Sequence, residues 1–245
     1  TEIINVMQQD MGAELDIPSA VNWNFTGQQE EQAKEMAFLS KALLIALFMI
    51  FLIIVSQFNS VSTPFVIGFS VVFSLIGVLL GLVVFQMEFV IIMTMIGIIS
   101  LAGVVVNNAI VLIDYTNLLR ARRRAVLGSA EGQSAEEDTK LPFAEVNTAI
   151  IQGGKTRLRP VLLTAITTVL GLLPLAIGLN IDFVGLVTNY NPNIYVGGDN
   201  NVFWKPMSWA IIFGLTFATF LTLIIVPVMY WWIERTTYKL AGRGV

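Results

Sequence analysis

The sequence predicts an all-α membrane protein: a bundle of five transmembrane helices, preceded by a short strand and helix remnant. Hydrophobic residues make up 56 % of the 245 residues and charged residues only 13 %, with a mean hydropathy of +0.76. A soluble domain of this length carries more charge. The apolar residues also gather in runs that approach or exceed the ~17–25 residues with which a helix crosses a bilayer.

The first 35 residues are polar and acidic, and they lack the basic start and apolar core of a signal peptide. Alternation over residues 20–25 predicts a strand, and residues 28–41 favour a helix that leads into the first span. This order is typical of a larger extramembrane domain that ends at the membrane. We therefore expect residues 1–35 to be the tail of a larger extramembrane domain, and the chain to begin within a longer protein.

Three apolar runs, residues 42–58, 61–86 and 89–113, predict the first three spans within residues 36–116. The short connection between the first two ends in Pro64, which suits a tight helical hairpin. In the second span Gly77 and Gly81 lie four residues apart, a spacing that lets another helix approach closely.

The segment 117–159 is predicted to be a cytoplasmic linker with an amphipathic helix over residues 141–152. Basic residues flank it on both sides, and positive charge beside spans marks the cytoplasmic face. They are Arg120, Arg122, Arg123, Arg124, Lys155, Arg157 and Arg159. A nucleic-acid interface is disfavoured, because the arginine run directly adjoins a membrane span.

Residues 160–235 are expected to hold the fourth span, from Pro160 to Leu179, and the fifth, over residues 206–233. Proline is tolerated in the first turn of a helix, so Pro160 suits a helix start. The loop 180–205 between these spans is nearly free of positive charge and is expected outside, while residues 236–245 form a cytoplasmic tail. Five spans then place the N-terminus outside and the C-terminus inside.

The adjacent amides Asn107 and Asn108 lie within the third span, and a polar group in lipid needs a partner. Two interpretations stay open: hydrogen bonds between helices, worth on the order of 1 kcal/mol, or an ion or proton pathway. Asp114 follows Asn107 by seven residues, on roughly the same helix face. It is either an interfacial carboxylate paired with an arginine or a proton entry or exit group.

Composition narrows the chemistry further. The chain has no cysteine and no histidine, so any proton carrier must be a carboxylate, and we predict no metal site and no cofactor. Without a nucleophile–base pair or a phosphate-binding loop, the sequence does not predict an enzyme. Thr164, Thr167 and Thr168 in the fourth span can bond back to their own helix or reach the third span.

Two segments carry a resemblance to a known family. GVVVNNAIVLIDY at Gly103–Tyr115 and GGKTRLRPVLLTAITTVLGLLPLAIG at Gly153–Gly178 resemble the resistance-nodulation-division (RND) efflux pumps, hydrophobe/amphiphile branch. WNFTGQQEE from Trp23 resembles the family's last periplasmic strand and the helix after it, which implies that residues 1–35 are the tail of the periplasmic porter domain. The segment Trp204–Tyr230 extends the match to spans eight through twelve, the C-terminal half of the membrane domain.

The resemblance implies a homotrimeric, proton-driven exporter of drugs or other amphiphiles in the bacterial inner membrane. A periplasmic adaptor and an outer-membrane channel complete the path in that family, and protons load onto intramembrane aspartates in the other half of the pump. The coupling positions carried over are Arg157, Thr164, Asn108 and, where the family has lysine, Asn107.

Asn107 departs from the family pattern, because a neutral amide lacks the Coulomb attraction that a lysine has for an ionised aspartate. Coupling could then rest on Arg157, on Thr164 or on another ion. The alternatives are a scaffold subunit that transports nothing and, less favoured, a translocation accessory of the SecD/SecF type.

Overall fold

The computed structural model describes residues 28–58, 62–130, 141–182, 187–190 and 193–240. The chain divides into two compact units, Thr1–Ala37 and Phe38–Val245. In the first unit, the described residues are the opening turns of helix α2, where Lys34 and Glu30 form an ion pair. The strand predicted over residues 20–25 lies outside the described residues. All further contacts belong to the second unit.

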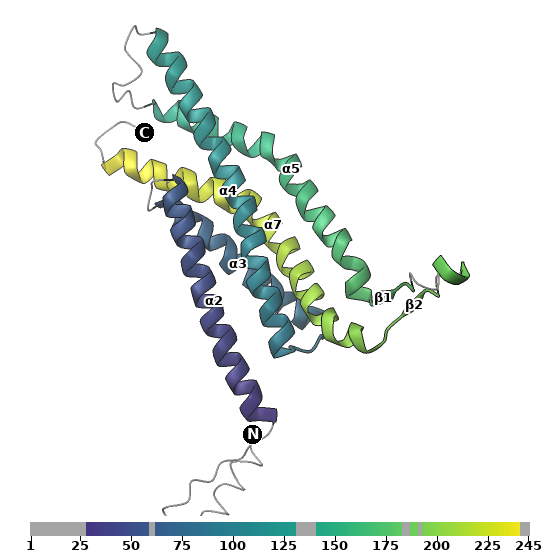
Figure 1. Cartoon of the computed structure of the whole chain (residues 1–245). Coiled ribbons are helices and arrows are strands. Elements are labelled where there is room, and N and C mark those ends of the chain that lie inside the picture. The colour runs from purple at the N-terminus through teal and green to yellow at the C-terminus, as the bar shows by residue number, and fades with distance from the viewer. Residues whose placement is uncertain (1–27, 59–61, 131–140, 183–186, 191–192, 241–245) are drawn as a thin grey trace, which may run out of the picture. The chain divides into compact units, whose positions relative to one another are not determined.

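Among the described residues, five helices are long and apolar enough to cross a membrane, which confirms the predicted all-α class. Figure 1 shows them in chain order from purple to yellow. They are α2 (Gln28–Phe58), α3 (Ser62–Val84), α4 (Ile91–Ala130), α5 (Phe143–Ile177) and α7 (Asp199–Leu240).

Helix α7 packs against α3, α4 and α5, and it forms the centre of the second unit. Gly77 and Gly81 of α3 allow this close approach. A Cβ on Gly77 would lie 2.6 Å from the Cβ of Phe217, and one on Gly81 would lie 2.2 Å from the ring of Phe213. The predicted helix contact at this glycine pair is therefore confirmed, and its partner is α7.

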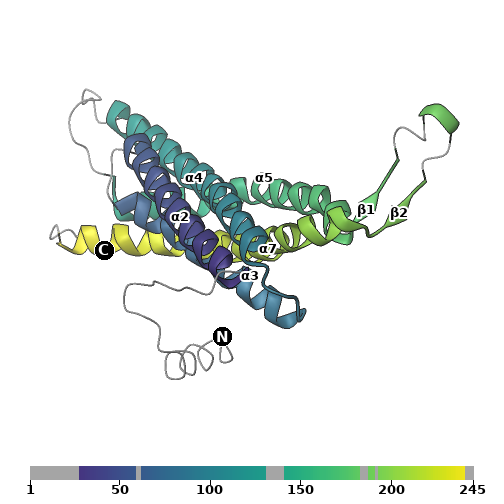
Figure 2. The same ribbon diagram turned by 60° about the horizontal axis from the view of Figure 1, so that its bottom comes forward.

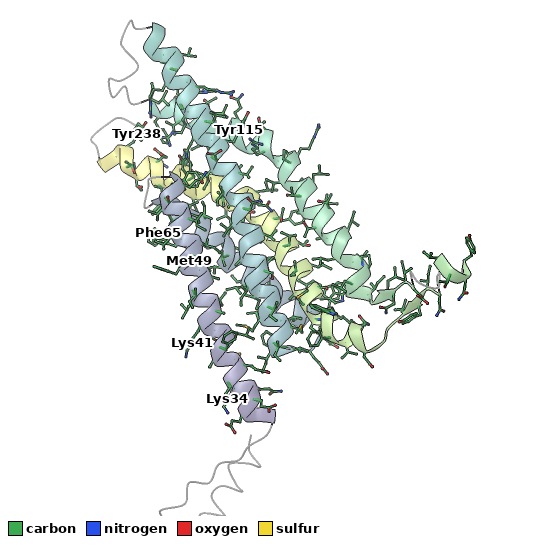
Figure 3. The ribbon with its side chains drawn as sticks, in the orientation of Figure 1. Lys34, Lys41, Met49, Phe65, Tyr115 and Tyr238 are labelled. Carbon is green, nitrogen blue, oxygen red and sulfur yellow. The ribbon has the colours of Figure 1, made fainter. Side chains whose placement is uncertain are left out.

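Helices α2 and α5 keep much of their apolar surface exposed. Only 11 % of the most apolar stretch of α2 and 17 % of that of α5 is buried, against 44–56 % for the other three helices. Within the second unit, Ile54 of α2 is buried, and the ring centre of Phe51 lies 6.3 Å from that of Phe65 on α3, which is labelled in Figure 3. The outer faces of both helices are left for lipid or for further protein.

Two helices extend beyond the spans predicted for them, and the helix start predicted at Pro160 is wrong. Helix α4 continues through the arginine run to Ala130, because leucine, arginine and alanine favour helix whether or not lipid surrounds them. The predicted amphipathic segment and the fourth span form one helix, α5, with Pro160 inside it rather than in its first turn. A change in polarity marks where a helix meets the membrane surface, not where the helix ends.

Helix α7 also begins earlier than predicted, at Asp199, so that Pro206 lies within it. At its other end it continues to Leu240, into the predicted tail. There the hydroxyl of Tyr238, labelled in Figure 3, donates a hydrogen bond to the carbonyl of Leu141 at 2.6 Å. This contact ties the end of α7 to the residues just before α5.

A short hairpin joins α5 to α7 and was not predicted. Strand β1 (Leu179–Asn180) pairs antiparallel with β2 (Tyr195–Val196), as Figure 2 shows beyond the ends of α5 and α7. Gly178 ends α5 in the left-handed conformation, with φ 75°, which turns the chain into β1.

Candidate functional site

The five candidate residues lie on two helices that pack against each other. Helix α4 carries Asn107, Asn108 and Asp114, and α5 carries Arg157 and Thr164. Some of these side chains face the contact between α4 and α5, and others face away from it.

Asn108 and Thr164 meet at this contact. Asn108 is buried, and the Thr164 hydroxyl lies 3.4 Å from its Oδ1 and 2.9 Å from the carbonyl of Val161. A hydroxyl has one proton, so the shorter bond to Val161 takes it. A 180° rotation of the Asn108 side-chain amide lets its NH₂ donate to the same hydroxyl oxygen. Thr167 and Thr168 instead bond back to their own helix, at Leu163 and Thr164.

Arg157 contacts α4 through an aromatic ring rather than a carboxylate. Its guanidinium carbon lies 4.4 Å from the ring centre of Tyr115, the labelled side chain on α4 in Figure 3. Arg157 Nε is buried, and within the described part of the chain it finds no hydrogen-bond acceptor. The stacked arginine thus keeps its charge unneutralised by any described residue.

Asn107 and Asp114 face outward from α4. Both side chains are exposed, and seven residues at ~100° each bring them within ~20° of one another around the helix. Across the described ranges Asp114 forms no ion pair, so the predicted pairing with an arginine is not found there. An outward amide and carboxylate on an apolar helix call for a polar partner beyond these five helices.

A second polar cluster, which sequence reasoning missed, joins α4 to α7. Arg120 Nη1 donates to Glu234 Oε1 at 2.7 Å and to the Tyr230 hydroxyl at 2.5 Å, and that hydroxyl donates to Asn117 Oδ1 at 2.6 Å. Next to it lies a pocket of about 260 Å³. The sequence does contain a signal for this cluster: the acidic residue Glu234 directly follows one apolar span, and the basic run that begins at Arg120 follows another.

The arrangement offers hydrogen bonds and one unpaired cation, but no group of metal ligands. No cluster of three or more aspartates or glutamates that could hold a metal ion occurs in the ranges that the structure describes. The missed partner in the candidate site is Tyr115. Sequence spacing could not pair it with Arg157, since the register between two helices depends on their packing.

The chain is similar to known membrane proteins over most of its length. Residues 2–234 match the model of the AcrB/AcrD/AcrF family. The chain is 36 % identical over 216 residues to the swarming motility protein SwrC of Bacillus subtilis (strain 168), which covers 88 % of this chain and 17 % of SwrC. It is 27 % identical over 231 residues to the multidrug resistance protein MdtC of Klebsiella pneumoniae (strain 342), covering 94 % of this chain and 19 % of MdtC.

Solved structures show the same similarity. Two crystal forms of a heavy metal efflux pump match with TM-scores of 0.63 and 0.65, each at 25 % identity. They cover 94 % and 96 % of this chain but only 19 % and 20 % of the pump. The chain thus spans about a fifth of the length of the relatives that it matches.

Proposed function

The chain belongs to the AcrB/AcrD/AcrF family of resistance-nodulation-division efflux transporters, and we propose that it supplies five membrane helices to a proton-driven pump. The proposed cargo is drugs or other amphiphiles, in keeping with the multidrug resistance relatives. The activity is transport, without a covalent change to the cargo. The family match favours this function over a SecD/SecF-like accessory.

The observation that carries the proposal is the polar outward face of α4. Asn107 and Asp114 are exposed with mostly apolar residues between them, and next to Asn107 the buried Asn108 contacts the exposed Thr164. In lipid such a face is costly, so another polar surface is expected to cover it. The proposed cover is the remaining half of the pump, with its intramembrane aspartates.

A neutral amide can follow the protonation of such an aspartate. The NH₂ of Asn107 can donate to an ionised carboxylate, and its carbonyl oxygen can accept from a protonated one. The amide therefore adapts to both states, but it favours the ionised one less than a lysine would. The positive charge that favours ionisation would come from Arg157, two turns or on the order of 10 Å before Thr164 along α5.

Location and partners follow the same proposal. The basic side chains in the second half of α4 and the first half of α5 favour a cytoplasmic position for these parts of the two helices, whereas residues 180–205 contain a single basic residue, Lys205. This orientation puts the N-terminus in the periplasm and the C-terminus in the cytoplasm of the inner membrane. We further propose a homotrimer that works with a periplasmic adaptor and an outer-membrane channel.

The test uses the complete protein that contains this chain, reconstituted in liposomes with a pH-sensitive dye inside. Substrate-dependent proton flux is measured for Thr164→Ala and Thr164→Ser. Loss of one hydrogen bond of ~1 kcal/mol predicts about a fivefold lower flux for alanine and nearly normal flux for serine. Thr148→Ala is the matched control, since Thr148 is an exposed threonine of α5 that bonds only back to Ala144 among the described residues.

Two results would contradict the proposal. Transport that continues without any proton flux would assign the coupling to a different ion. A complete protein that neither transports nor moves protons, although correctly inserted, would favour the scaffold alternative. The presence or absence of paired intramembrane aspartates in the remaining half distinguishes these two cases by sequence alone.

A further inference from the structure

An apolar groove lies between α5 and α7, away from the contact of Asn108 with Thr164. Its volume is about 510 Å³, and its walls are residues of the first half of α5 and the second half of α7. This size lies within the range of ~300–1,000 Å³ that is typical of ligand pockets.

The walls are apolar and open to the surroundings. Ile151 and Leu158 of α5 are 51 % and 46 % exposed, and Val228 of α7 is 57 % exposed. Leu223 and Trp231 of α7 add further apolar surface to the lining. Such a surface favours hydrocarbon over water, by roughly 25 cal/mol for each Å² that a ligand covers. The guanidinium of Arg235 stacks on the ring of Trp231, with its carbon 5.0 Å from the ring centre.

Among the residues that line this mainly apolar groove, Lys155 is the one with a cationic side chain. Lys155 is exposed and, within the described residues, forms no ion pair. The nearby amide of Asn147 adds a hydrogen-bonding group to the lining. A long apolar slot with one free cation matches a ligand that has a hydrocarbon chain and an anionic head.

We propose that the groove between α5 and α7 binds one anionic phospholipid, with its headgroup at Lys155 and an acyl chain that runs from there along Leu158 and Leu223. The position supports a lipid, because tryptophan and basic residues gather where helices leave the hydrocarbon core, and basic pockets between spans bind anionic headgroups. A zwitterionic lipid would fill the slot equally well but would gain less from Lys155.

The experiment counts lipids that stay bound to the complete protein after release from nanodiscs made of equal parts phosphatidylglycerol and phosphatidylcholine, using native mass spectrometry. Lys155→Gln keeps most of the side-chain length and removes the charge. We expect the ratio of bound phosphatidylglycerol to phosphatidylcholine to fall about fivefold. Arg159→Gln is the control, because Arg159 is exposed one turn further along α5 and does not line the groove.

A second variant tests the groove independently of charge. Gly154 lines the groove, and a Cβ placed on it meets no atom within 4 Å, so a Gly154→Leu side chain has room at its base and extends into the slot. We expect it to lose one bound lipid of either kind. Gly68→Leu on α3, also without a neighbour within 4 Å of the added Cβ, is the matched control and keeps that lipid.

Three results would overturn the proposal. Equal loss of preference in Lys155→Gln and Arg159→Gln would indicate general surface attraction. Unchanged retention in Gly154→Leu would place the lipid elsewhere. The absence of any retained lipid in the unaltered protein would mean that another part of the pump covers the groove.

Discussion

Replacing Glu234 by leucine tests the polar cluster that joins α4 to α7. The substitution leaves the guanidinium of Arg120 without its carboxylate, while the Tyr230 hydroxyl still accepts one hydrogen bond. The side chains of Arg120 and Glu234 are only 18 % and 17 % exposed, so water replaces the lost partner poorly. We expect the packing of the C-terminal turns of α7 against α4 to weaken.

The magnitude follows from this burial. Removing one partner of a fully buried ion pair costs ~3–5 kcal/mol. Because Arg120 keeps some exposure and one hydrogen bond, we expect about 2–3 kcal/mol, which is a factor of ~30–150 in an equilibrium constant. Replacing both partners, with Arg120→Met and Glu234→Leu together, leaves no unpaired charge and is expected to stay within ~1 kcal/mol of the original.

Hydrogen exchange of the complete protein, read by mass spectrometry over residues 227–240, reports the local opening of α7. Amide exchange there should rise ~30–150-fold in the single variant and less than ~10-fold in the double variant. Glu145→Leu is the control, since Glu145 pairs with Arg123 between α4 and α5 but is 41 % exposed. An exposed pair of this kind contributes only ~0–1 kcal/mol.

The reasoning is refuted if the single and double variants exchange at the same rate. That result would mean that the charge left on Arg120 is solvated, so the cluster would be an ordinary surface contact. Equal effects of Glu234→Leu and Glu145→Leu would lead to the same conclusion.

Two further predictions concern the packing of α7. Gly81→Ala should destabilise the helix bundle by ~1–3 kcal/mol, because the new methyl group overlaps the ring of Phe213. Thermal unfolding in detergent measures this loss, with Gly68→Ala as the control. Equal unfolding temperatures for the two variants would argue against the close approach of α3 and α7. Trp209→Phe removes the 2.9 Å hydrogen bond from the indole Nε1 to the carbonyl of Ala176. It should cost ~1 kcal/mol and speed amide exchange at the end of α5 about fivefold, and unchanged exchange there would show that water replaces the indole.

The five spans could be predicted because transfer from water to hydrocarbon depends on composition over ~20 residues, which is visible without knowing any contact. Helix ends could not be predicted in the same way. Pro160 was expected to start a helix, but it lies inside α5, because packing and neighbouring groups can compensate for its missing N–H. The hairpin of β1 and β2 needed a pairing across the loop that no local pattern indicated.

The sequence by itself determined that this chain is an all-α membrane protein of the RND family, since hydropathy and the motifs around Asn107 and Arg157 are local properties of the chain. Only the tertiary structure decided which polar groups meet. It turns Asn108 toward Thr164 and leaves Asn107 and Asp114 outward, and it stacks Arg157 on Tyr115. Adjacent helix positions point ~100° apart, so packing against α5 and α7, rather than residue type, separates two neighbouring asparagines into one buried and one exposed.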